Sequence, residues 1–420
     1  MARGRLTSLF RRPVADPCLE AAKAAHAAGD FAEARRRLAP LVGGGGTTVE
    51  AMRGLAELEY LLGNYVAAEA LLCRVVEGSG RNREARVDAE VALALVYLQT
   101  NRYAEAEGLF SSDGNAIDLP IWELMRSWGN EPPYGIDWHG GPEVSVPFTQ
   151  GTDWELPSIA IELDGRPVET RIDTGGDFLI LSPDIADALG VAPVVTTTGT
   201  FGGGAQGSLS YGKLGMMRVG GITVRNVPVA IAGLEKPVLG TGLLRQFLAT
   251  IDYPGNRLVL RPPTTAARGA LRAELSAADA VDVPFALALT HLIIARGSLD
   301  GVAPLTFIVD SGLQDEEGAA FAAPQETLAA AGIATPETTE DVRETGAGRV
   351  PLQIGRFPVQ RLALGPLVQH DLRGFYGVFP DGWKQPAGFP IHGIVSHGFL
   401  RRYAWTLDFQ AMTMSFASAA

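Results

Sequence analysis

The sequence predicts a multidomain protein with an α-helical N-terminal repeat region followed by two related β-rich lobes. Three observations carry this prediction. One tripeptide pattern occurs twice, two closing segments align without gaps, and an earlier stretch has helical apolar spacing. A chain of 420 residues is long enough for two or three domains with cores of their own.

The tripeptides Asp173-Thr174-Gly175 and Asp310-Ser311-Gly312 occupy the same place in two copies of one unit. Each follows a short apolar run. Upstream of each is an Asp-Gly pair between apolar stretches, ending at Gly165 or Gly301, which is a strong hairpin signal. One such tripeptide is weak evidence in a chain with 50 glycines, but two in matching positions are much stronger. Two carboxylates brought to one spot share a proton, so one can act as base and the other as acid.

The closing segments of the two copies match best. Residues 242–253 align without gaps on residues 398–409, and five of the twelve positions are identical. An alternating strand follows a turn in both copies. An internal repeat of this length predicts two related lobes rather than one large sheet.

With these motifs the chain resembles the aspartic peptidases of the retroviral and pepsin type, and more closely their bacterial two-lobed members. Further markers are Val238-Leu239-Gly240 and the Asp-aromatic closing strand of each lobe. The resemblance covers residues 144–418. It implies an all-β bilobal acid-protease fold with β-barrel-like lobes at 144–265 and 280–418.

The resemblance implies that Asp173 and Asp310 form the catalytic pair of an aspartic endopeptidase. A water between them would attack a peptide carbonyl, without a metal or another cofactor. The substrate would be an extended peptide in a cleft between the lobes. The following residues, Gly176 and Leu313, cannot donate a hydroxyl hydrogen bond to the ionised pair. We therefore expect a less acidic optimum than in pepsin-like enzymes that have Ser or Thr there.

The other tripeptide residues have supporting roles by the same resemblance. Thr174 and Ser311 would carry the hydroxyls that tie the two loops together. Gly175 and Gly312 would let the backbone pass close beneath the pair.

The second lobe departs from the family pattern in two places. Ser396 stands where the pattern has Gly, and the stretch after Gly312 is acidic rather than apolar. These departures leave an alternative open: a catalytically inactive, protease-like protein that binds peptides or serves as a scaffold.

A glycine-rich stretch follows Asp173 at the distance of a flap. Gly202, Gly203 and Gly204 lie between apolar strands and predict a mobile hairpin tip that closes over substrate. The second-lobe counterpart contains Gly346 and Gly348. The alternative is an ordinary glycine-rich hairpin. A phosphate-binding loop would need Gly-Lys-[Ser/Thr], which both stretches lack.

Residues 17–112 resemble a short tetratricopeptide (TPR) array. A turn, an aromatic residue and small residues recur around Phe31, Tyr65 and Tyr103, at spacings of 34 and 38 residues. Such an array usually binds a protein partner. The alternative is a helical domain that only packs against the β lobes. A linker at 113–143 should be fixed by its tryptophans, with a short helix near residues 121–127.

Composition bounds the remaining functions. A net charge of −12 speaks against nucleic acid as a main partner. No apolar run is long enough to span a membrane, and the N terminus lacks a secretory apolar region, so we expect a cytoplasmic protein. The alternative is an exported protein whose true start lies upstream. The histidines lack a His-Glu-x-x-His motif, and we expect no metal site.

Overall fold

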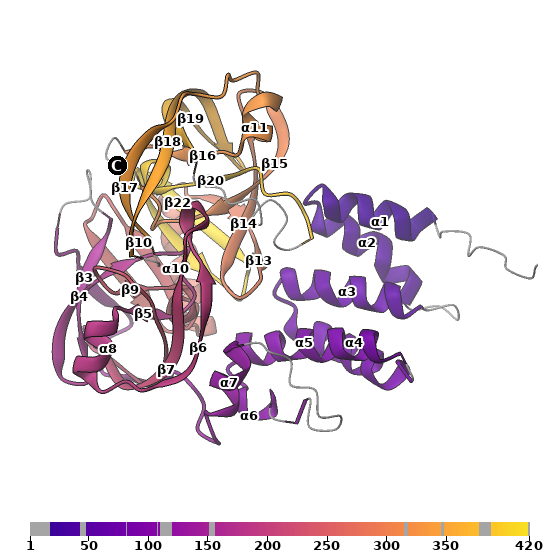
Figure 1. Ribbon diagram of the computed structural model, residues 1–420, viewed down its shortest axis with the longest axis horizontal. Helices are drawn as coiled ribbons and strands as arrows, with labels where there is room; N and C mark the ends of the chain where they lie inside the picture. The colour runs from indigo at the N-terminus through magenta and orange to yellow at the C-terminus, as the bar shows by residue number, and fades with distance from the viewer. Residues whose placement is uncertain are drawn as a thin grey trace, which may run out of the picture.

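The computed structural model describes residues 17–42, 48–80, 82–106, 108–109, 120–150, 156–314, 318–345, 348–377 and 388–418. Within these ranges, helices fill the first part up to residue 106, and strands dominate from residue 135 onward. Figure 1 shows helices α1 to α5 stacked to one side of a β-rich body. The predicted order, a helical region followed by extensive β-sheets, is confirmed. None of the described helices has both the length and the apolar character that crossing a membrane requires.

Six helices form three consecutive hairpins in the N-terminal region. They are α1 (Pro17–Ala27), α2 (Phe31–Val42), α3 (Val49–Leu61), α4 (Tyr65–Gly78), α5 (Arg83–Gln99) and α6 (Tyr103–Ala106). The three recurring aromatic residues are therefore the first residues of α2, α4 and α6. The alanine three positions after each aromatic residue has no exposed surface. A side chain this small lets neighbouring helices approach closely, which explains why aromatic and alanine recur together.

The linker residues bury two of their tryptophans. Trp122, in α7 (Pro120–Arg126), and Trp128 just after it are 4% and 6% exposed. The Trp128 ring lies 5.3 Å from the Tyr103 ring, and the Lys213 ammonium lies 4.8 Å from the centre of the Trp128 ring. Trp138 is partly buried, and its ring NH donates to the Gly141 carbonyl over 2.7 Å. Trp128 thus contacts both the helical region, at Tyr103, and the first lobe, at Lys213.

The first lobe is an eight-stranded sheet in the order β1-β8-β5-β9-β4-β3-β7-β6. Its strands are β1 (Gly135–Trp138), β3 (Ser158–Leu163), β4 (Arg166–Ile172), β5 (Leu179–Leu181), β6 (Pro193–Thr200), β7 (Gln206–Val219), β8 (Ile222–Ile231) and β9 (Val238–Leu239). Two short helices, α8 (Pro183–Leu189) and α9 (Thr241–Leu244), follow β5 and β9.

The second lobe repeats this plan with the order β13-β14-β15-β20-β16-β19-β18-β17. Its elements are β13 (Ala286–Ala288), β14 (Leu292–Leu299), β15 (Val302–Val309), β16 (Phe321–Ala322), α11 (Gln325–Ala330), β17 (Thr339–Thr345), β18 (Gly348–Leu364), β19 (Leu367–Tyr376), β20 (Gly393–Val395) and α12 (His397–Leu400).

The Asp-Gly pairs form the predicted tight turns. Asp164 and Gly165 have φ of 44° and 84°, and Asp300 and Gly301 have 45° and 90°. Both residues of each turn are left-handed, as a two-residue hairpin of this kind requires.

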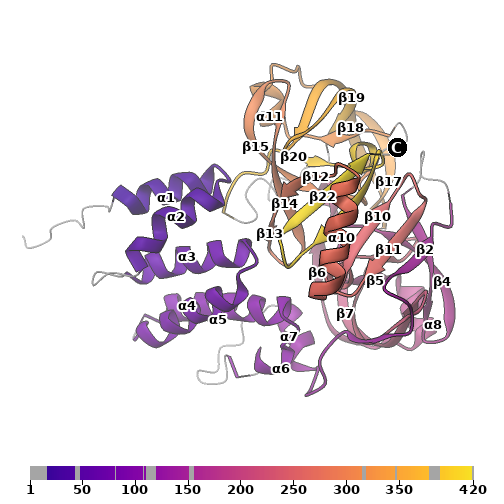
Figure 2. The same ribbon diagram turned by 180° about the vertical axis from the view of Figure 1, so that it is seen from behind.

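A six-stranded sheet joins the lobes in the order β12-β22-β21-β10-β11-β2. Its strands are β2 (Val144–Pro147), β10 (Leu248–Asp252), β11 (Arg257–Arg261), β12 (Val281–Pro284), β21 (Tyr403–Asp408) and β22 (Thr413–Ser418). The two closing segments that align in the sequence pair here, with the Thr250 and Thr406 hydroxyls 2.7 Å apart. Figure 2 shows α10 (Thr265–Ala277) on the outer side of this sheet.

Gln99, at the end of α5, links the helical region to both lobes. Its amide donates to the second-lobe carbonyl of Thr290 over 2.7 Å and to the Tyr60 hydroxyl over 3.1 Å. Its side-chain oxygen accepts from Arg245 of the first lobe, whose guanidinium also donates to the Leu98 carbonyl over 3.0 Å. Gln99 is 7% exposed, its bond with Tyr60 is buried, and the bonds with Thr290 and Arg245 are partly buried.

Gln99→Ala is expected to lower the free energy of unfolding by about 1–3 kcal/mol, because it removes a buried side chain and leaves the partly buried Thr290 carbonyl without this donor. Denaturant unfolding at equilibrium measures the change. The exposed Gln325 of α11 supplies the control, Gln325→Ala, whose effect should stay within about 0.5 kcal/mol. Equal effects of the two substitutions would show that the interface contributes no stability.

Candidate active site

The two aspartates follow equivalent strands in the two lobes. Asp173 comes directly after β4, which pairs in parallel with β9, and its amide donates to the Leu239 carbonyl over 3.1 Å. Asp310 comes directly after β15, which pairs in parallel with β20, and its amide donates to the Val395 carbonyl over 2.9 Å. The duplicated sequence therefore builds two loops with the same backbone anchor.

Thr174 and Ser311 cross-link the two loops. The Ser311 hydroxyl oxygen accepts from the Thr174 amide, and the Thr174 hydroxyl oxygen accepts from the Ser311 amide, both over 3.0 Å. Each hydroxyl donates in turn across the lobe boundary, Thr174 to the Val309 carbonyl over 3.0 Å and Ser311 to the Ile172 carbonyl over 3.2 Å. Both side chains are fully buried. The bonds agree with the tying role that the sequence resemblance implies for these hydroxyls.

The carboxyl groups of Asp173 and Asp310 are brought together over the two glycines. The Gly175 amide donates to Asp173 Oδ1 over 2.7 Å, and the Gly312 amide donates to Asp310 Oδ1 over 2.8 Å. A methyl group on Gly175 would lie 2.5 Å from Asp310 Oδ2, and one on Gly312 would overlap the carboxyl atoms of Asp173. Each glycine thus borders the carboxyl group of the other lobe, and no larger residue fits there.

The pKa of Asp310 is raised well above the ordinary carboxyl value. Burial is the largest cause, followed by the negative charge of Asp173 and a hydrogen bond with the Asp173 side chain. The Gly312 amide acts in the opposite direction by donating to the ionised form. Two carboxyl groups that share a hydrogen bond in a poorly solvated place cannot both ionise cheaply, so the pair tends to hold one proton.

Ser396 fits the second lobe although the equivalent Gly240 has no room for a side chain. A methyl group on Gly240 would lie 2.6 Å from the carbonyl oxygens of Gly176 and Phe178. Ser396 is fully buried, and its hydroxyl donates to the Ala319 carbonyl over 2.7 Å. In the sequence, the second lobe carries extra residues before Ala319. The departure from the family pattern therefore comes with a compensating hydrogen bond.

The predicted flap is a hairpin of β6 and β7. Thr200 pairs with Gln206 at the end of the ladder, and the tip is a short 3-10 turn at Gly202–Gly204. Gly204 has φ of 79°, which favours glycine. In the second lobe, Thr345 pairs with Gly348, the first residue of β18. Gly346 lies outside the described residues. The closing motion of either tip stays a prediction.

Two side-chain pairs, one buried and one partly buried, were not predicted as parts of the site. The Tyr253 and His397 rings lie 5.4 Å apart, and the pKa of Tyr253 is raised first by burial and then by the charges of Asp310 and Asp173. Asp177, four residues after Asp173, has its Oδ2 3.9 Å from His291 Nδ1. The first pair carried a sequence signal, because Tyr253 ends one closing segment. His291 carried none, because its contact spans the two lobes.

Residues 159–246 match the model of a family described as "gag-polyprotein putative aspartyl protease". The resemblance to retropepsin-like aspartyl proteases is confirmed. The retropepsin-like match lies in the first lobe and includes Asp173 and the flap hairpin. Among the described residues, no group of three or more His, Cys, Asp or Glu side chains is arranged to hold a metal ion.

Two known proteins are similar to parts of the chain. DNA damage-inducible protein 1 of Neurospora crassa is 31% identical over a stretch that covers 24% of each protein. The chain thus spans about a quarter of the length of this curated relative. The crystal structure of a retropepsin-like aspartic protease from Rickettsia conorii is 17% identical, with a TM-score of 0.24, over 31% of this chain and 96% of that chain.

Proposed function

We propose that this protein is an aspartic endopeptidase in which Asp173 and Asp310 activate one water molecule. The observation that carries the proposal is the meeting of two carboxyl groups, one from each lobe, with the pKa of Asp310 raised by burial and by Asp173. The retropepsin-like family match of the first lobe supports the same reaction class.

The proposed reaction needs no covalent intermediate. Asp173 takes a proton from the water while the water oxygen attacks the peptide carbonyl carbon. Asp310, which keeps its proton to higher pH, donates to the carbonyl oxygen as negative charge develops there. A proton then passes to the leaving nitrogen, the carbon–nitrogen bond breaks, and a new carboxyl group and a new amine result.

The proposed substrate is an extended peptide lying across the aspartate pair, with the β6–β7 hairpin closing over it. An extended backbone can hydrogen-bond as an added strand, while its side chains confer specificity. We further propose the domain limits 17–112, 144–265 and 280–418, with β1 of the intervening stretch completing the first-lobe sheet and the two β lobes acting as one catalytic unit.

The alternative function is a non-catalytic scaffold. We propose that α1 to α6 form a TPR-like array, on the basis of the 34-residue spacing between the residues that begin α2 and α4. Such an array binds a protein partner whether or not the β lobes cleave peptides.

A peptide-mixture assay separates the two functions. Wild-type protein is incubated with a defined mixture of synthetic peptides, and new termini are read by mass spectrometry from pH 3 to pH 8. Endopeptidase activity predicts cleavage at internal bonds. Binding of the same peptides without new termini at any pH would favour the scaffold.

The pH profile should have its maximum above pH 4. The raised pKa of Asp310 keeps its proton in place as the pH rises, which moves the alkaline limb of the profile upward. Gly176 and Leu313 carry no hydroxyl that could stabilise the ionised pair. Initial cleavage rates at constant ionic strength measure the profile. A maximum well below pH 4 would contradict this reasoning.

A further inference from the structure

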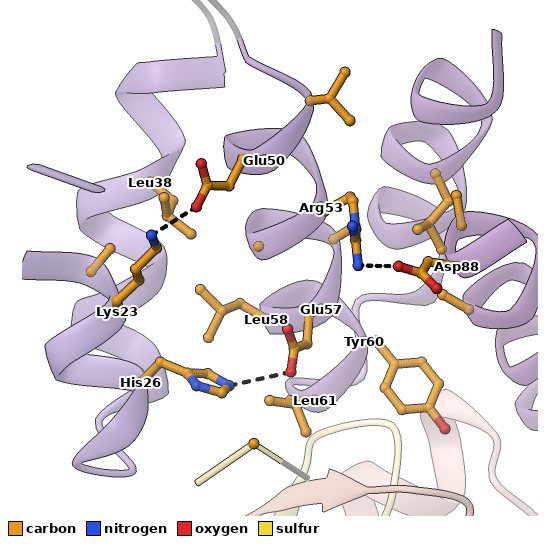
Figure 3. A pocket seen from close by; sticks show the side chains of 18 of the residues that line it. Lys23, His26, Leu38, Glu50, Arg53, Glu57, Leu58, Tyr60, Leu61 and Asp88 are labelled. Carbon is orange, nitrogen blue, oxygen red and sulfur yellow. Dashed lines mark ion pairs between the residues drawn. The ribbon is translucent and has the colours of Figure 1, made fainter. Parts of the chain in front are cut away.

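A groove of about 950 Å³ crosses the inner faces of α1, α3 and α5 (Figure 3). We call it the helical groove. Its floor is aliphatic, and the lining side chains that keep exposed surface there include Leu19, Ala27, Val49, Ala92 and Leu95. An apolar floor of this kind gains free energy by covering aliphatic side chains.

Ion pairs at the rim of the groove join neighbouring helices. Lys23 of α1 lies 2.7 Å from Glu50 of α3, and Arg53 of α3 lies 2.7 Å from Asp88 of α5. All four side chains are about half exposed, at 44–60% of their surface. Figure 3 shows both pairs bordering the aliphatic floor. These charged groups can therefore hydrogen-bond the backbone of a bound polypeptide whose side chains pack on the aliphatic floor.

The second lobe supplies the inner end of the groove. Leu289 and Gly388 line it together with the helices. Leu289 is 40% exposed, and its carbonyl accepts from the Tyr60 hydroxyl. The next carbonyl, of Thr290, is the acceptor of Gln99. The end of the groove is thus fixed by hydrogen bonds that come from the helices themselves.

The groove lies within reach of the aspartate pair. His291, two residues after Leu289, contacts Asp177, four residues after Asp173. Because consecutive Cα atoms are 3.8 Å apart, these steps place Leu289 at most roughly 35 Å from Asp173. About ten residues of extended chain span this distance. A polypeptide that extends about ten residues beyond the Leu289 end of the groove is therefore long enough to reach the aspartate pair.

We propose that the helical groove binds an aliphatic, extended stretch of the substrate polypeptide within about ten residues of the cleaved bond. This proposal rests on the proposed peptidase function and names its substrate class: unfolded polypeptide long enough to reach both places. The occupant is the substrate chain, because one end of the groove is built from the turn that leads from Leu289 to His291 beside Asp177.

The test compares long and short substrates with matched variants. Arg53→Glu sets two carboxylates against each other at the groove rim, and Ala92→Trp fills the groove without a charge change. Arg37→Glu is the control. Arg37 is 46% exposed and lies 2.7 Å from Glu33 on α2, away from the groove lining, so it matches Arg53 in exposure and pairing. Exposed pairs contribute little stability, so the charge variants should fold.

We expect Arg53→Glu and Ala92→Trp to lower kcat/KM about tenfold on 20-residue peptides, mainly through KM, and to leave 6-residue peptides unaffected. Arg37→Glu should change neither. Equal loss on long and short peptides, or no loss on long ones, would overturn the proposal.

A binding measurement keeps this test separate from the peptidase proposal. Fluorescently labelled, carboxymethylated casein is titrated with Asp173→Asn protein, with and without each groove substitution, and anisotropy is read. Weaker binding in both groove variants supports the groove even if wild-type protein cleaves nothing, in which case the peptidase proposal alone fails. Unchanged binding in both variants counts against the groove whatever the cleavage result.

Discussion

Asp310→Asn is expected to abolish peptide cleavage and, near neutral pH, to raise the free energy of unfolding. The amide cannot supply the acidic proton, so cleavage should fall by at least about 10³-fold. Stability should rise although activity is lost, because the pKa of Asp310 is raised by burial and by Asp173. The folded protein holds this proton more tightly than the unfolded chain. The stabilisation that this bound proton gives the folded protein is fully present below the usual carboxyl pKa. It is lost as the pH rises through the raised pKa of Asp310.

The Asn side chain stays uncharged and avoids this loss. The free energy of unfolding of wild type should therefore decline above about pH 4, by up to about 1.4 kcal/mol per pH unit for this group. Asp310→Asn should decline less steeply. Chemical unfolding at several pH values measures both slopes. Identical slopes would show that Asp310 does not hold a proton in the folded protein.

Gly312→Ala is expected to cause a second large loss. The added methyl group would overlap the carboxyl group of Asp173, so the loop or the aspartate must move. A misplacement of about 1 Å can cost about 100-fold in rate, and overpacking costs about 1–3 kcal/mol of stability. Cleavage rate and denaturant unfolding measure the two effects.

Gly269→Ala provides the matched control. Gly269 lies inside α10, and no neighbouring heavy atom comes within 4 Å of an added methyl group. The substitution should stabilise the protein by about 0.5–1 kcal/mol, since alanine favours a helix, and leave cleavage unchanged. If Gly312→Ala behaved like this control, the two loops could not be packed as closely as described.

Local signals predicted much of the β lobes. The Asp-Gly pairs at 164–165 and 300–301 need left-handed backbone at both positions, and few residue pairs adopt it readily. The aligned closing segments predicted equivalent strands, which turn out to pair with each other. The retropepsin-like resemblance of the first lobe could be predicted because its motif lies in one contiguous stretch, and the family match over residues 159–246 confirms it.

Features that depend on distant contacts could not be predicted. Ser396 looked like a defect, yet the Ala319 carbonyl that accepts from it lies 77 residues earlier in the chain. The contact between His291 and Asp177 joins two lobes, and Leu289 completes a groove whose other walls are helices. Sequence spacing does not encode such contacts, because they join residues far apart in the chain that meet only when the tertiary structure forms.

The most direct test of the central claim compares peptide cleavage by Asp173→Asn, Asp310→Asn and the double variant under identical conditions. If the two carboxyl groups act as one unit around one water, each single variant should be as inactive as the double, since neither residue works alone. Circular dichroism would verify that all three proteins are folded. Cleavage that survives Asp310→Asn but not Asp173→Asn would contradict the paired mechanism.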